Sequence, residues 1–204
     1  MDTTLTAPAA LRLCAAAVAA CGILLCANAA LYCYRTGCNG SPPFVSHIMV
    51  SEHSELAALE SALIVSLTLL VAFSATLQLA TGGFTATQFQ AAWVAVPFAI
   101  VCASFDTKKF TTLHVSTYFS LLVLSLCLAT ASWLPLLFFT PYLVRHATRK
   151  RRPRSDASPR TKRLRPYGYG PDIQVFVLVL VVLGIVTANL SAAARLEGQL
   201  QKLP

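Results

Sequence analysis

The fold is decided by LCAAAVAACGILLCANAALYCY, residues 13–34. These 22 residues contain no charged side chain. A helix needs about 20 apolar residues to cross the hydrocarbon core of a bilayer. The run therefore predicts a transmembrane helix. A cleaved signal peptide is the alternative interpretation, with Arg12 as a thin basic region and Ala27-Asn28-Ala29 as a small-residue cleavage site.

The composition of the whole chain agrees with a membrane protein. Of its 204 residues, 56% are hydrophobic and only 12% are charged, whereas soluble domains carry about 25% charged residues. The apolar residues also lie in long blocks rather than in the short stripes of a surface helix. We therefore expect a single membrane domain with an all-α fold, a polytopic transmembrane helical bundle of about five spans, at residues 13–34, 56–79, 89–105, 110–143 and 173–194.

The run 110–143 has 34 residues, or about 51 Å of helix, which exceeds one bilayer. It is either one helix that leaves the bilayer or two spans hinged near Trp133-Leu134-Pro135. Cytoplasmic loops are enriched in Lys and Arg, and with the N-terminus inside only one span puts the following basic segment in the cytoplasm. We therefore expect one long helix, kinked or broken at Pro135. Five spans then place the C-terminus on the exoplasmic side, together with residues 35–55.

The basic segment, residues 144–171, is the predicted cytoplasmic loop. Ten of the sixteen Lys and Arg residues fall between Arg145 and Arg165. Topology alone could account for them, and contact with anionic lipid is the functional alternative, at about 1 kcal/mol per basic residue. Nucleic acid is not expected as a partner, because the segment is tethered between spans. The residues predicted to contact anionic lipid are Arg149, Lys150, Arg151, Arg152, Arg154, Lys162 and Arg163.

A second polar interruption, VCASFDTKKFTTLHV at residues 101–115, separates the third and fourth apolar runs. A hairpin between two spans must lie at the water interface, because its backbone needs hydrogen-bond partners. His114 comes about one turn inside. It is either satisfied by water and headgroups or part of a functional site, as intramembrane ionisable groups often are. The second hypothesis predicts a candidate polar exoplasmic site formed by His114, Ser46, Glu55 and Asp106.

Three further side chains attract attention. Glu60 lies one turn inside the second span, where it could be a proton relay or an ion ligand, or could snorkel or pair with a loop charge. Cys33 and Cys38 flank a polar turn and either form a disulfide on an oxidising exoplasmic side or stay as two thiols.

Metal and enzyme chemistry are not favoured by the sequence. It shows no Cys/His cluster, nucleotide motif or nucleophile elbow, so we expect no metal and no cofactor, and an enzyme is the less favoured class. A small channel or transporter is a weaker alternative, since polar residues within the spans are few: Asn28, Ser66, Thr68, Ser125 and Asn189.

Two stretches together resemble a known family. One is Pro43-Phe44-Val45-Ser46, followed by Glu52 and Glu55 ahead of the second span, and the other is IVCASFDTKKFTTLHVSTYF, residues 100–119. They resemble the damage-regulated autophagy modulator (DRAM) family of polytopic membrane proteins, whose relatives include a factor of GPI-anchor lipid remodelling and a protein linked to phosphoinositide kinase function. The family typically has six spans, and its loop usually carries a proline directly before the acidic residue.

The resemblance implies a protein of the endomembrane system (ER, Golgi or lysosome) or the plasma membrane. It implies a lipid-organising or regulatory role with membrane lipids as partners. GPI-anchor lipid remodelling is the alternative function within the same family.

Overall fold

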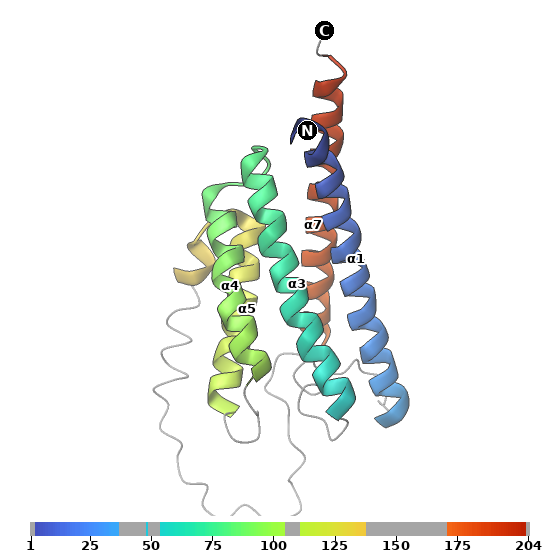
Figure 1. The fold of residues 1–204 in the computed structure, drawn as a ribbon. Coiled ribbons are helices and arrows are strands. Elements are labelled where there is room, and N and C mark those ends of the chain that lie inside the picture. The colour runs from blue at the N-terminus through green and yellow to red at the C-terminus, as the bar shows by residue number, and fades with distance from the viewer. Residues whose placement is uncertain (1–2, 37–47, 49–53, 105–110, 138–170, 203–204) are drawn as a thin grey trace, which may run out of the picture.

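The computed structural model describes residues 3–36, 48, 54–104, 111–137 and 171–202. Within these ranges the chain forms helices and no strand. The long helices are α1 (Thr3–Thr36), α3 (Ser54–Ala80), α4 (Ala86–Ser104), α5 (Thr111–Thr130) and α7 (Pro171–Leu200), as Figure 1 shows. The predicted all-α bundle of about five spans is confirmed.

Four segments are long and apolar enough to cross a membrane: Ala7–Thr36, Ser54–Ala80, Ala86–Ser104 and Leu178–Leu200. Large apolar side chains point outward from them, among them Leu13, Ile23, Phe73 and Leu183. In water such a surface would be unfavourable, whereas in lipid it needs no cover. The chain is therefore an integral membrane protein with several spans.

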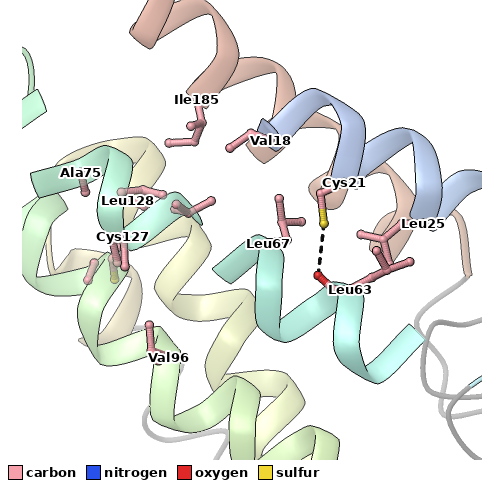
Figure 2. Packing of buried hydrophobic residues seen from close by; sticks show 14 of the residues in the cluster. Val18, Cys21, Leu25, Leu63, Leu67, Ala75, Val96, Cys127, Leu128 and Ile185 are labelled. Carbon is pink, nitrogen blue, oxygen red and sulfur yellow. Dashed lines mark hydrogen bonds between the residues drawn. The ribbon is translucent and has the colours of Figure 1, made fainter. Parts of the chain in front are cut away.

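Helix α3 lies between two helix pairs, α1 with α7 and α4 with α5 (Figure 1). It packs against α1 on one side and α4 on the other, and α5 also touches α7. One apolar core runs through the five helices, and Figure 2 shows its centre. Its fully or nearly buried members are Val18, Cys21, Leu25, Leu63, Leu67, Val71, Ala72, Ala75, Ala91, Ala92, Val96, Val123, Cys127, Leu128 and Ile185.

The directions of the helices define two ends of the bundle. Arg12 near the start of α1 pairs with Glu197 near the end of α7, at 2.6 Å between Nη2 and Oε2. This contact shows that α7 runs antiparallel to α1. Helices α3 and α5 run in the same direction as α7, and α4 runs in the same direction as α1 (Figure 1). We call this end, marked by Arg12, Gly82, Thr130 and Glu197, the terminal end. The other, marked by Thr36, Ser54, Ser104, Thr111 and Pro171, is the loop end.

The position of the C-terminal helix differs from the prediction, which placed the C-terminus beside residues 35–55. In the structure α7 ends where α1 begins, since Glu197 contacts Arg12. The antiparallel pairing packs Leu11 against Ala192 and Ala193. The prediction assumed that the last span begins at the same end of the bundle at which the fourth span ends. However, α5 ends at the terminal end and α7 starts at the loop end (Figure 1).

Helices α3 and α5 end with the same C-capping geometry. Gly82 follows α3 with a φ of 69°, and the Gly83 N–H donates to the Gln78 carbonyl at 2.7 Å. After α5, Ala131 has a φ of 51° and the Ser132 N–H donates to the Cys127 carbonyl at 3.3 Å. Both are the left-handed cap that satisfies the last carbonyls of a helix.

The cap after α5 breaks the apolar run 110–143. Helix α5 ends at Thr130, and the chain turns before residues 134–137 become helical again. The Ser132 hydroxyl accepts a hydrogen bond from the Leu134 N–H at 3.1 Å and so caps this next turn. Pro135 then falls in a first helical turn, where a missing N–H costs little.

Candidate functional site: two buried polar clusters

The first cluster joins α1 to α3. Asn28 and Glu60 are only 3% and 1% exposed. The Asn28 amide nitrogen donates to Glu60 Oε2 at 2.7 Å and to the Leu56 carbonyl at 3.1 Å. Glu60 is six residues from the start of α3 at Ser54, which places it about 9 Å inside the loop end. We call Asn28 and Glu60 the acid–amide pair.

The orientation of the Asn28 amide follows from its partners. The Leu56 carbonyl can only accept a hydrogen bond, so the amide nitrogen must face it. The amide oxygen, Oδ1, is then buried and has no donor among the described residues. Buried polar atoms are usually hydrogen-bonded, so Asn28 Oδ1 needs a hydrogen-bond donor.

Two further polar contacts join α1 to α3, one on each side of the acid–amide pair. At the loop end the guanidinium of Arg35 lies 3.9 Å from the carboxylate of Glu55. Deeper in the bundle the Cys21 thiol donates to the Leu63 carbonyl at 3.3 Å, as Figure 2 shows. Polar contacts therefore hold α1 to α3 mainly in the half of the bundle nearer the loop end.

The second cluster joins α3 to α7 near the terminal end. Ser74, Gln78 and Asn189 are all at most 1% exposed. The Asn189 oxygen accepts from the Ser74 hydroxyl at 2.7 Å and from the Gln78 amide nitrogen at 2.8 Å. The Asn189 nitrogen has no acceptor in the described part of the chain. We call these three residues the amide cluster.

Gln78 also fixes the turn that follows α3. Its backbone carbonyl accepts the N–H groups of Gly83 and Phe84, at 2.7 and 3.2 Å. Its side-chain oxygen occupies the space that a β-carbon on residue 83 would need. A β-carbon on residue 83 would displace the Gln78 side chain, so the amide cluster is coupled to the α3–α4 turn.

That turn is held from a second direction. Thr85 and Gln88 form a reciprocal capping box at the start of α4, with distances of 3.0 and 3.3 Å. The Gln88 amide nitrogen also donates to the Leu128 carbonyl of α5 at 3.0 Å. The terminal ends of α3, α4 and α5 are thereby fixed to one another.

The two clusters do not form one polar path. Glu60 and Ser74 are 14 residues apart on α3, or about 21 Å, and the buried residues between them include Leu63, Leu67 and Val71. The described residues contain no group of three or more His, Cys, Asp or Glu side chains that could hold a metal. Each cluster joins two helices by hydrogen bonds, and the two clusters lie near opposite boundaries of the bundle.

The predicted site residues have different outcomes. Glu60 is buried and paired with Asn28. Glu55 is exposed at the loop end, where it faces Arg35. Ser46, Asp106 and the side chain of His114 lie outside the described residues, as do Cys38 and the predicted lipid-contacting arginines and lysines of residues 144–171. The polar exoplasmic site and the disulfide thus stay predictions.

Ser74 and Gln78 were missed by sequence reasoning. Their spacing of four residues puts both on one face of a helix. A polar pair with that spacing inside an apolar run is typical of an interhelical hydrogen-bond site.

Comparisons with models of known protein families, with curated proteins and with solved structures found no match for this chain.

Proposed function

We propose that this protein is a lipid-organising or regulatory membrane protein that adapts the bilayer around a bundle of uneven length. The observation that carries the proposal is the difference between neighbouring spans. The helical segments that can cross the membrane have 30 residues in α1 and 27 in α3, whereas that of α4 has 19. These lengths correspond to about 45, 40 and 28 Å, against a hydrocarbon thickness of about 30 Å.

A span longer than the hydrocarbon core tilts or locally thickens the bilayer, and a shorter one thins it. Here the freedom to tilt is limited, because α3 and α4 share a turn that the Gln88 contacts hold to α5. The Trp93 indole also donates to the Thr76 hydroxyl between α3 and α4, at 3.0 Å. A rigid bundle with long spans on one side therefore favours thicker bilayer on that side than beside α4 and α5.

The resemblance to the DRAM family supports the same class of function, and we propose membership of that family. It also supports residence in the endomembrane system or plasma membrane, with anionic lipid as the partner of residues 144–171. A channel or transporter is less favoured, because apolar residues separate the two polar clusters within the described bundle. GPI-anchor lipid remodelling is the alternative function, and analysis of GPI-anchor lipids in cells lacking the protein distinguishes it.

The test is reconstitution of the full chain into phosphatidylcholine vesicles of increasing acyl-chain length, with thermal stability measured in each. We expect a stability optimum in chains longer than those that best match a 19-residue span. Leu13 is 72% exposed near the terminal end of α1, so Leu13→Lys shortens the apolar length and should move the optimum to thinner bilayers. Leu13→Ala is the matched control. Stability that does not depend on chain length in any variant contradicts the proposal.

The lipid partner of the basic segment needs a separate measurement. Replacing the lysines and arginines of residues 144–171 with glutamine removes the charge that attracts anionic headgroups. We expect the purified variant to retain less phosphatidylserine than the unaltered protein, when both are taken from membranes of the same composition. Equal retention contradicts the assignment of anionic lipid as a partner.

A further inference from the structure

We infer that the acid–amide pair is a proton-binding site: Glu60 carries a proton and donates it in a hydrogen bond to the amide oxygen of Asn28. The two side chains then form a reciprocal acid–amide bond that fastens α1 to α3. This inference goes beyond the proposed function and does not depend on it.

The first step is the unsatisfied acceptor. Both hydrogens of the Asn28 amide nitrogen are used, one on Glu60 Oε2 at 2.7 Å and one on the Leu56 carbonyl at 3.1 Å. Turning the amide over would place oxygen against the Leu56 carbonyl, which has no hydrogen to give. Asn28 Oδ1 must therefore find a donor, and a neutral carboxyl group on Glu60 has one O–H to offer.

The second step is that the described side chains place no positive charge beside Glu60. Arg35 is the nearest basic side chain along α1, seven residues from Asn28, or about 10 Å, and it faces Glu55. The other titratable side chains in this part of α1 are thiols and phenols, which carry no positive charge: Cys21, Cys26, Tyr32, Cys33 and Tyr34. The Cys21 thiol donates to the Leu63 carbonyl. An isolated carboxylate within a membrane is costly, so the neutral acid is the favoured form.

Among the side chains that the structure describes, the remaining helices do not supply a cation either. Over the side chains that the structure describes, α4 and α5 carry only the thiols of Cys102 and Cys127 as titratable groups. Between Leu178 and Ala194, α7 has no ionisable side chain. The charged residues of α7 that follow, Arg195 and Glu197, lie at the terminal end.

A metal ion fits the pair less well than a proton. Calcium takes six to eight oxygen ligands and magnesium about six, whereas the pair offers one carboxyl group and one amide oxygen. The nearby Leu56 carbonyl already accepts a hydrogen bond. A proton needs only one donor and one acceptor, and the pair provides these.

A bound proton makes this part of the α1–α3 interface sensitive to pH. When the proton leaves, the carboxylate loses its donor role and Asn28 Oδ1 is again left beside it without a partner. The interface in this half of the bundle then depends on the Cys21 and Arg35 contacts. We expect α1 and α3 to separate more easily at the loop end in alkaline buffer.

Infrared spectroscopy of the full chain in lipid nanodiscs tests the protonation directly. At neutral pH the unaltered protein should show the C=O stretching band of a neutral carboxylic acid, and this band should be absent from Glu60→Gln. Glu55→Gln is the matched control, because Glu55 is on the same helix with an 85% exposed side chain, and it should keep the band. Two results would overturn the inference. One is that Glu60→Gln loses carboxylate bands and no neutral-acid band. The other is that the carboxylate bands shift when sodium or calcium ions are added.

A thermal measurement gives an independent test. Glutamine retains a donor and an acceptor but cannot titrate, so Glu60→Gln should fold and keep the same melting temperature from mildly acidic to alkaline buffer. In mildly acidic buffer the unaltered protein should have the same melting temperature as Glu60→Gln. As the pH rises, the melting temperature of the unaltered protein should fall below that of the variant, because the stability that depends on the bound proton is lost when the proton dissociates. Parallel pH profiles for the two proteins overturn the inference.

Discussion

Gly22 faces Val182 where α1 crosses α7, and this contact gives the sharpest test of the packing. A β-carbon on residue 22 would lie 3.0 and 3.2 Å from the two γ-carbons of Val182. Carbon atoms pack best at about 3.5–4.0 Å, so Gly22→Ala pushes the two helices apart or forces Val182 out of its rotamer. We expect this variant to be destabilised although alanine is the better helix former.

The magnitude follows from two opposing effects. Replacing glycine with alanine inside a helix stabilises by about 1 kcal/mol. Overpacking a well-filled contact costs about 1–3 kcal/mol. A β-carbon on Gly184 of α7 would meet no atom within 4 Å, so Gly184→Ala should show the gain without the cost. The two variants should thus differ by about 1–3 kcal/mol, or about 2–12 °C in melting temperature for a protein of this size.

The assay is thermal unfolding of both variants in the same detergent, with Val182→Ala as a third background. Removing the two γ-carbons should relieve the Gly22→Ala variant, so the double variant should be more stable than the sum of the single changes predicts. Equal melting temperatures for Gly22→Ala and Gly184→Ala would refute the close α1–α7 contact. So would strictly additive effects of Gly22→Ala and Val182→Ala.

Three other predictions concern the amide cluster, the paired helix ends and the orientation. Asn189→Leu removes the acceptor shared by two buried donors and should cost about 1–3 kcal/mol, measured by thermal unfolding. Arg12→Cys with Glu197→Cys should be joined by a short bifunctional thiol reagent, because the tips of the two long side chains touch, and a shift in gel mobility would report it. Cysteines at Ser54 and Lys202 should react with impermeant reagents from opposite sides of the membrane, with the Ser54 side cytoplasmic.

Controls separate these effects from general disturbance. Thr187→Val alters an exposed hydroxyl whose bonds among the described residues stay within its own helix, and should change stability by much less than Asn189→Leu. Arg35→Cys with Glu197→Cys places the cysteines at opposite ends and should not cross-link. Labelling of both reporters from one side would contradict the helix directions, and a cross-link between residues 35 and 197 would do the same.

The orientation in that prediction follows from charge and from the position of α7. Arg35 lies at the loop end, and α7 starts there directly after the basic segment. Ser104 and Thr111 also lie at this end, and the sequence between them contains two lysines. Because cytoplasmic ends are enriched in Lys and Arg, we expect this end to face the cytoplasm. The cytoplasmic location predicted for residues 144–171 is then kept. Glu55 would lie on that side too, instead of on the exoplasmic side expected from the sequence.

The helices could be located from sequence because their apolar runs are long and their breaks carry polar or glycine residues. The second span is expected at 56–79 and forms at Ser54–Ala80. The end of α5 at Thr130 is harder to place, because Ala131 adopts a left-handed conformation that its residue type does not announce.

The neighbours of each helix could not be read from its pattern. Every face of α1 is apolar, so nothing in the run 13–34 shows that one face meets α7 and another α3. Glu60 stands out as a carboxylate within a span, but its partner Asn28 is 32 residues away. A contact of that kind depends on how the helices pack and on their direction, which the hydrophobic pattern leaves open.

The pairing of α1 with α7 has a consequence for how the protein is made. Gly22 and Val182 are far apart in the chain, and at about 5–20 residues per second the ribosome takes roughly 8–32 s between them. During that interval the face of α1 that will meet α7, including Gly22, has no partner in its own chain. The first helix must therefore wait in the translocon, in lipid or on an insertion chaperone until the last one arrives. Nascent chains stalled before α7 should stay associated with the insertion machinery longer than complete ones.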